Sequence, residues 1–184
     1  MANARYAANT EARCYWCKDI VYRALGAHAA DHQLGTLVDG MNADDTKAHR
    51  PGRGAAEALG VASPLFEAGL TKANVRALAA SRGLSLWDKP AMACLSSRIT
   101  YGEPVTAQKL ALVEAAEEAI TVLGFRRVRV RMHGDLARIQ VDPEDFDRLV
   151  AHRATVEAAL LVLGFAHVTV DLGGYRPATA ARRA

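Results

Sequence analysis

Long apolar runs are absent from this sequence of 184 residues. No stretch approaches the roughly 18 consecutive apolar residues that a membrane-spanning helix needs. The opening segment MANARYAANTEAR also lacks the apolar core of a secretory signal. We therefore expect a soluble, cytoplasmic protein that has no membrane partner. Its hydrophobic fraction of 51% is sufficient for a packed core.

The net charge is small and the cysteines are few. The formal net charge is only +3 and no basic stripe is present, so bulk electrostatics do not favour a nucleic-acid partner. The cysteines are Cys14 and Cys17, which form a C-x-x-C pair in RCYWCK, and the distant Cys94. Because a structural disulfide is not expected in a cytoplasmic protein, the pair indicates a metal, cluster or redox site.

Three interpretations of the cysteines are open on these grounds. All of them can be small core residues, because an unpaired cysteine is often buried. A zinc site would use two thiolates and a third ligand from Cys94 or a histidine. An iron–sulfur cluster held by three thiolates would leave one iron to bind another ligand.

Patterns in the first half predict α/β architecture. Apolar residues recur at helical spacing after Cys14, and residues 36–38 form a short apolar run that predicts a buried strand ending at Asp39. A further helix is predicted from an N-cap at Thr71 to Gly83. Ligands of such sheets bind at the carboxyl ends of the strands. The polar side chains there suit magnesium or a ribose (Asp39, Asn42, Asp44, Asp45) and phosphate (Arg50, Arg53).

The pattern changes near residue 106. Helical and alternating segments follow one another twice, and VLGF recurs at 122–125 and 162–165, each time between a helix and a strand. Two helix–strand units around a small antiparallel sheet predict a ferredoxin-like α+β domain. We place the boundary near residues 101–104, which gives domains of residues 1–103 and 104–184.

Arginines mark two candidate site segments. The alternating segment VRVRMH, residues 128–133, places Arg129, Arg131 and His133 on one strand face. Paired arginines predict a site for phosphate or carboxylate, and a solvated sheet face is the alternative. Arg98 follows Cys94 in AMACLSSRITYG. That segment fits a cysteine with a lowered thiol pKa as well as a helix-capping serine pair beside a surface arginine.

These segments together resemble one known family. RCYWCK, LVDGMNADD, RPG, SPL, DKPAMACLSSRITYG, RVRVRMHGDLARI and DLGGYR occur in the same order in LarE-type enzymes, and the resemblance runs from about Tyr6 to Pro177. These enzymes are ATP-dependent sacrificial sulfur transferases of the PP-loop pyrophosphatase superfamily. The resemblance implies an adenine nucleotide alpha hydrolase-like, Rossmann-like first domain, with ATP and Mg²⁺ as cofactors.

The resemblance also implies a reaction in the biosynthesis of the nickel-pincer nucleotide cofactor. ATP adenylylates a carboxylate of pyridinium biscarboxylic acid mononucleotide, and sulfur then replaces the adenylate to give a thiocarboxylate. In some members a cysteine at the position of Cys94 gives up its own sulfur and becomes dehydroalanine. In others three cysteines, matched here by Cys14, Cys17 and Cys94, hold a 4Fe–4S cluster whose open iron carries the transferable sulfide.

The resemblance further assigns site residues and an assembly. Arg98, Arg129 and Arg131 match positions that bind the phosphate and carboxylates of the nucleotide-type substrate. Glu117 and Asp145 match other active-site positions of the family. The family implies a homo-oligomer.

One motif of the family is missing. PP-loop enzymes carry S-G-G-x-D-S, whose backbone amides hold the ATP pyrophosphate, and this sequence has no such segment. We expect that the chain lacks the first strands and the phosphate loop of the first domain. A start at an internal methionine, a split enzyme with a separate N-terminal half and a decayed copy would each explain this. The alternative functions are a tRNA-thiolating PP-loop enzyme and a non-catalytic iron–sulfur or zinc-binding remnant.

Overall fold

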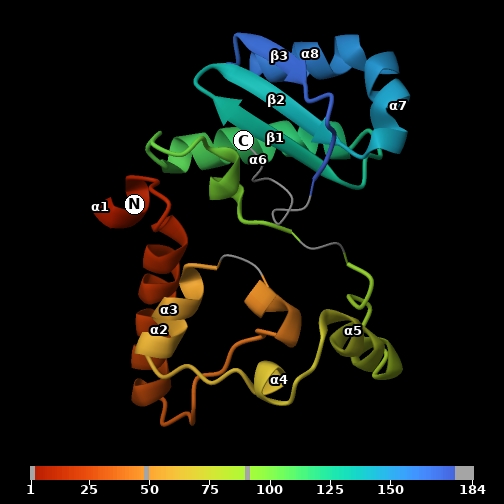
Figure 1. The fold of residues 1–184 in the computed structure, drawn as a ribbon. Coiled ribbons are helices and arrows are strands. Elements are labelled where there is room, and N and C mark those ends of the chain that lie inside the picture. Colours follow the sequence, from red (N-terminus) through yellow and green to blue (C-terminus); the bar gives the residue numbers. More distant parts are fainter. Residues whose placement is uncertain (1–2, 48–49, 90–91, 177–184) are drawn as a thin grey trace. The chain divides into compact units, whose positions relative to one another are not determined.

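The computed structural model describes residues 3–47, 50–89 and 92–176 (Figure 1). The chain divides into two compact units. The helical unit comprises residues 10–91, and the sheet unit joins residues 1–9 to residues 92–184. None of the helices in the described ranges is long and apolar enough to cross a membrane.

The first residues of the chain belong to the sheet unit, together with the residues from Met92 onward. The domain division that we predicted between residues 103 and 104 stays a prediction. Helix α1 (Ala4–Ala7) is followed by Asn9, whose buried amide donates hydrogen bonds to the carbonyl oxygens of Thr100 and Glu103, both at 2.8 Å. The Val105 amide also donates to the Ala7 carbonyl at 2.8 Å. These long-range bonds attach residues 3–9 to the later part of the chain.

The helical unit is built around one long helix. Helix α2 (Arg13–Asp31) packs against α3 (Gly52–Ala58), and α4 (Pro64–Glu67) and α5 (Lys72–Ser81) follow. A short 3₁₀ helix, η1 (Ala43–Lys47), precedes α3. The predicted ends of α5 are confirmed. Thr71 forms a capping box with Asn74, and Gly83, with φ of 70°, follows the helix.

The predicted buried strand at residues 36–38 is wrong. Val38 makes a single parallel bridge to Ala62, and its side chain is 56% exposed. Among the described residues this segment pairs along one side only, through the backbone hydrogen bonds of Leu37 and Asp39 with Ala62. Leu37 packs against the small cluster of Tyr22, Ala56 and Val61, but Val38 on the other face is exposed, so the segment is not a buried strand. A PP-loop assignment for this unit stays a prediction.

The sheet unit contains a three-stranded sheet. Helix α6 (Ala107–Thr121) leads to β1 (Val128–His133) and β2 (Leu136–Val141). The 3₁₀ helix η3 (Pro143–Asp145), α7 (Phe146–Ala151) and α8 (Arg153–Val162) then lead to β3 (His167–Val170). Figure 1 shows the strands in the order β1–β2–β3, with β2 in the centre.

The direction of one strand differs from the prediction. Strands β1 and β2 are antiparallel, but β2 and β3 are parallel, so the expectation of an antiparallel sheet is wrong. The reason is the connection, because η3, α7 and α8 form a helical crossover between β2 and β3. The repeated VLGF does end a helix before a strand both times, with φ of 92° at Gly124 and 107° at Gly164. A ferredoxin-like fold as such stays a prediction.

The two faces of this sheet differ in chemistry. In the β1–β2 register Val130 lies opposite Ile139, and their face is buried against α6 and α8. The alternate residues, Arg129 opposite Gln140 and Arg131 opposite Arg138, form the other face. The alternation predicted for residues 128–133 is therefore confirmed. The buried core consists of Ala116, Ile120, Phe125, Val130, Ala137, Ile139, Val141, Leu149, Val156, Leu160 and Phe165.

Candidate active site beside Cys94

Cys94 is an exposed thiol at the start of a short turn. It is the N-cap of the 3₁₀ helix η2 (Leu95–Arg98), and its carbonyl oxygen accepts a hydrogen bond from the Ser97 amide at 2.9 Å. The Cys94 Sγ lies 3.2 Å from the Ser96 Oγ, which in turn accepts a hydrogen bond from the Tyr6 hydroxyl at 3.2 Å. The thiol is therefore accessible and has hydroxyl groups beside it.

A buried ion pair fixes this turn. The Arg98 side chain is 4% exposed and the Glu117 side chain 14%. Their two hydrogen bonds run from Nε to Oε1 at 2.7 Å and from Nη2 to Oε2 at 3.1 Å. The third nitrogen of Arg98, Nη1, donates to the carbonyl oxygens of Ala93 and Cys94. Because Glu117 Oε1 also accepts from the Val130 amide at 3.0 Å, the pair links the Cys94 turn to α6 and β1.

Arg131 links the same turn to the polar face of the sheet. Its Nη1 donates to the Ser97 carbonyl at 3.0 Å, and its Nε donates to the Gln140 Oε1 at 2.8 Å. A parallel bridge between Ile99 and Met132 runs alongside. Burial lowers the pKa of Arg131, and repulsion from Arg129, Arg138 and Arg98 lowers it further. The turn and the arginines therefore form one site.

The segment DLGGYR, residues 171–176, packs against Arg129. Arg129 Nη2 donates to the Tyr175 hydroxyl at 2.8 Å, and the guanidinium lies 4.3 Å from the centre of the Tyr175 ring. Arg129 Nη1 donates to the Arg176 carbonyl at 3.1 Å. The Tyr175 amide donates to the Val141 carbonyl at 2.7 Å, which holds the segment along β2.

Asp171 is the first residue of this segment, and its carboxylate accepts two hydrogen bonds. The Gln140 amide nitrogen donates to it at 2.6 Å and the Gly173 backbone at 2.9 Å. Burial alone would raise the pKa of Asp171, but these hydrogen bonds and the nearby Arg138 outweigh it, and the pKa is lowered. Sequence reasoning missed Gln140, Asp171, Tyr175 and Arg138.

Two further predicted residues of this unit lie beside other partners. The Asp145 carboxylate accepts a hydrogen bond from Arg148 Nη1 at 3.2 Å, and its role in a site stays a prediction. His133 Nδ1 lies 3.1 Å from the Thr100 Oγ1. Burial lowers the pKa of His133, and repulsion from Arg138 adds to the effect.

Cys14 and Cys17 lie in the helical unit. They occupy the first turns of α2 and are half-buried, and a spacing of three positions puts both on one helix face. Within the described ranges, no group of three or more His, Cys, Asp or Glu side chains is arranged to hold a metal ion. The zinc and cluster interpretations stay predictions.

The predicted magnesium and ribose ligands hold their own loop together. Asp39 accepts from the Tyr22 hydroxyl at 3.0 Å and the Ser63 hydroxyl at 2.8 Å. Asp44 accepts from the Lys72 amide at the start of α5, at 2.9 Å. Asp45 pairs with Arg50 at 2.6 Å. A role for these side chains with magnesium or ribose stays a prediction.

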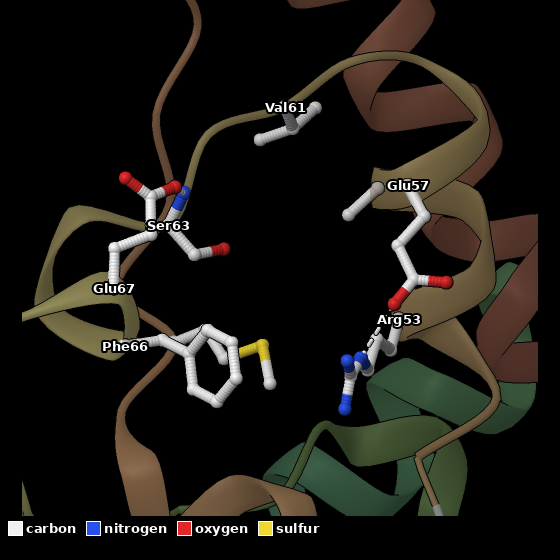
Figure 2. Close-up of a pocket in the computed structure, with 8 residues that line it drawn as sticks. Arg53, Glu57, Val61, Ser63, Phe66 and Glu67 are labelled. Atoms are coloured by element: carbon white, nitrogen blue, oxygen red, sulfur yellow. Dashed lines mark hydrogen bonds and ion pairs between the residues drawn. The ribbon is translucent and has the colours of Figure 1, made fainter. Parts of the chain in front are cut away.

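A surface hollow of about 180 Å³ lies in the same unit (Figure 2). Figure 2 shows Arg53 and Glu57 on one side of it and Ser63 and Glu67 on the other. Arg53 pairs with Glu57 at 2.6 Å, and its guanidinium lies 5.5 Å from the centre of the Phe66 ring. Its predicted contact with phosphate would compete with these partners.

Comparisons with known proteins bear on the whole chain. No protein-family model matches it. An uncharacterized protein of Synechocystis sp. is 42% identical over 178 residues, which is 96% of this chain and 66% of that protein. The pyridinium-3,5-bisthiocarboxylic acid mononucleotide synthase of Lactiplantibacillus plantarum is 40% identical over 168 residues, 91% of this chain and 61% of the synthase. An uncharacterized protein of Methanocaldococcus jannaschii is 26% identical over 91% of this chain and 66% of its own length.

The chain thus spans 61% to 66% of the lengths of these relatives. The similarity itself extends over more than nine-tenths of the chain, and it includes the Cys94 turn and the arginine-bearing sheet. The chain is therefore similar over most of its length to a pyridinium-3,5-bisthiocarboxylic acid mononucleotide synthase, in agreement with its resemblance to the LarE-type sulfur transferases.

Proposed function

We propose that the chain is the sulfur-transferring and substrate-binding part of an ATP-dependent sulfur transferase. Its substrate would be pyridinium biscarboxylic acid mononucleotide, whose carboxylates become thiocarboxylates. The observation that carries the proposal is the connection between an exposed cysteine and an arginine-bearing sheet face, made through Ser97, Arg98 and Glu117. The name of the Lactiplantibacillus plantarum relative supports the identity of the product.

The substrate would offer a phosphate and two carboxylates, all of which are oxyanions. Arg129 and Arg131 supply guanidinium groups on one face, and such groups bind oxyanions through paired hydrogen bonds. Arg98 has a different role in this proposal. Because Glu117 and two carbonyl oxygens already occupy its nitrogens, it positions the Cys94 turn and does not bind the substrate.

The reaction needs an activated carboxylate and a sulfur nucleophile. ATP, with Mg²⁺, adenylylates the carboxylate and releases pyrophosphate. Sulfur then attacks the carbonyl carbon, a C–S bond forms, the C–O bond to the adenylate breaks, and AMP leaves with the electron pair. If Cys94 is the donor, its Cβ–Sγ bond breaks next as a base removes the α-proton. The products are a thiocarboxylate and dehydroalanine at residue 94.

A 4Fe–4S cluster is the second source of sulfur in this proposal. Cys14, Cys17 and Cys94 would hold it, and their three thiolates are the ligands that such clusters prefer. The side-by-side position of Cys14 and Cys17 on α2 suits this role. When bound, the cluster would supply an iron without a protein ligand, from which sulfide is transferred.

The two sources make opposite demands on the cysteines. A cluster requires all three, so Cys14→Ala should abolish repeated turnover and the visible iron–sulfur absorption together. A sacrificial cysteine requires only Cys94, so the Cys14→Ala protein should give one turnover and then carry dehydroalanine at residue 94. Mass spectrometry of the protein after one turnover separates the two. The test uses the chain extended at its N-terminus by a segment with S-G-G-x-D-S.

The 184-residue chain alone should not release pyrophosphate from ATP in the presence of substrate, because it has no S-G-G-x-D-S segment to orient the triphosphate. A coupled pyrophosphate assay measures this. Robust release by this chain alone would contradict the assignment of the ATP step to a phosphate loop. A homo-oligomer and a cytoplasmic location remain part of the proposal.

A further inference from the structure

Arg138 is an arginine of the polar sheet face that the proposed function has not used. It lies on β2 directly opposite Arg131 in the β1–β2 register and beside Thr169 of β3. Its side chain is 39% exposed, so an incoming ligand can reach it. Its Nε, by contrast, is buried and has no hydrogen-bond partner.

The hydrogen bonding of Arg138 sets it apart from its neighbours. Arg98 is bonded to Glu117 and to two carbonyl oxygens. Arg129 is bonded to Tyr175 and Arg176, and Arg131 to Gln140 and Ser97. The nearest carboxylate oxygen to Arg138, on Asp171, lies 3.7 Å from its Nε, which is beyond hydrogen-bond distance.

The excess positive charge of this sheet face also favours the binding of an anion. Arg129, Arg131 and Arg138 lie on neighbouring strands with Asp171 as the acidic side chain beside them. Asp171 is already shared between Gln140 and Gly173. Burial lowers the pKa of Arg131, and repulsion from Arg129, Arg138 and Arg98 lowers it further. A bound oxyanion would relieve this repulsion by accepting hydrogen bonds from the exposed end of the Arg138 side chain.

We propose that Arg138 binds an acidic group of the substrate, in a site that it shares with Arg131. This inference rests on the proposed function and adds a residue to it. A guanidinium binds a carboxylate or a phosphate with two parallel hydrogen bonds, and its two terminal nitrogens can supply both donors. Arg138 is thus a specificity-determining residue, because its bound partner must be an oxyanion.

The test measures binding of nicotinic acid mononucleotide to the 184-residue chain by calorimetry. This probe is a pyridinium nucleotide with one carboxylate on its ring and one phosphate on its ribose. Arg138→Met should weaken binding about ten- to hundredfold, which is the expected loss of a charge-assisted hydrogen bond. Arg153→Met is the matched control, because Arg153 lies exposed on α8, and it should leave binding unchanged. Arg138→Lys keeps the positive charge but loses the paired donors of the guanidinium, so its affinity should lie between those of the unsubstituted chain and Arg138→Met.

Two related probes identify the group that Arg138 binds. Nicotinamide mononucleotide lacks the carboxylate, and nicotinic acid riboside lacks the phosphate. If Arg138→Met weakens only the probes that contain the carboxylate, Arg138 binds the carboxylate. If it weakens only those that contain the phosphate, it binds the phosphate. Either result supports the proposal.

Thermal unfolding separates binding from a structural role. Removing one of several like charges should leave the melting temperature of Arg138→Met unchanged or raised while affinity falls. Parallel losses of affinity and melting temperature in both Arg138→Met and Arg138→Lys would overturn the proposal. So would normal binding by Arg138→Met when Arg131→Met binds weakly, and that result would leave the proposed function in place. If the unsubstituted chain does not bind nicotinic acid mononucleotide, both fail.

Discussion

The helical unit and the sheet unit bury very different amounts of apolar surface. The sheet unit has a continuous core of eleven buried residues, with Phe125, Ile120, Ile139 and Leu160 among the largest. Among its described residues the helical unit has a cluster of three buried residues, Tyr22, Ala56 and Val61. Since burial of apolar surface is the main favourable term in folding, most of the stability should come from the sheet unit.

The polar residues of the proposed site follow the same division. The turn of Cys94 and the arginines of β1 belong to the unit with the larger core, and each is fixed there by hydrogen bonds to α6, β2 or residues 171–176. A site on a rigid scaffold keeps its geometry before the substrate binds. In the helical unit large apolar side chains are exposed even along α2 (Ile20, Val21, Leu25).

The largest effect should follow from breaking the buried ion pair of the sheet unit. Glu117→Ala leaves the guanidinium of Arg98 buried without its carboxylate, which typically costs about 3–5 kcal/mol of unfolding free energy. It also removes the acceptor of the Val130 amide. Chemical denaturation measures the loss, and hydrogen exchange should locate it in the sheet unit.

Glu57→Ala in the helical unit is the control, because its pair with Arg53 is exposed on both sides. Exposed pairs contribute at most about 1 kcal/mol. Equal losses for Glu57→Ala and Glu117→Ala would contradict the difference that we describe between the two units.

A matched pair of core substitutions, with a smaller expected loss of unfolding free energy, compares the two units directly. Val130 of β1 is fully buried in the large core, and Val61 lies in the small cluster of the helical unit. Val130→Ala should cost about 2 kcal/mol, because two methyl groups are lost and a cavity is left. Val61→Ala should cost about 1 kcal/mol or less, because the sparse surroundings can relax. A larger loss of unfolding free energy for Val61→Ala, measured by denaturation, would contradict our expectation that the sheet unit contributes more stability than the helical unit.

The smallest effect concerns Glu103 and acid. Its carboxylate accepts hydrogen bonds from Lys109 Nζ at 2.9 Å and from the Gly134 amide at 3.1 Å. The Lys109 bond is the main reason that the pKa of Glu103 is lowered. A lowered pKa in the folded state contributes stability above the unfolded pKa, and this stability is lost as pH falls through the folded value.

Glu103→Gln should therefore destabilise the sheet unit by less than about 1 kcal/mol at neutral pH, since both side chains are partly exposed. The difference from the unsubstituted protein should shrink as the pH falls below the pKa of Glu103 in the folded state. Denaturation at a series of pH values measures it. A stability difference that grows as the pH falls would show that the pKa of Glu103 is not lowered in the folded state.

Local patterns predicted the parts of the fold that depend on local physics. The cap of α5 at Thr71 and the alternation of Arg129 and Arg131 with valines follow from helix and strand geometry alone. The direction of β3 does not, because it depends on how the crossover of α7 and α8 returns to the sheet. The attachment of Asn9 to residues 99–103 likewise joins segments about ninety positions apart.

The site shows the same limit. Arg98 and Glu117 were each predicted through the family resemblance, but their mutual hydrogen bonds are a tertiary feature that spacing does not contain. Arg138 and Gln140 could have been found. Only Gly134 and Asp135 separate β1 from β2, and the alternation of LARIQV then places both residues opposite the arginines of β1.

The most direct test of the central claim is mass spectrometry of the reaction product with and without the Cys94 thiol. The chain, extended by an S-G-G-x-D-S segment, is given ATP, Mg²⁺, sulfide and pyridinium biscarboxylic acid mononucleotide. Our account predicts that the unsubstituted protein replaces a carboxylate oxygen by sulfur, and that Cys94→Ser gives no thiocarboxylate by either sulfur source. Equal thiocarboxylate formation by Cys94→Ser would contradict the assignment of sulfur transfer to this turn.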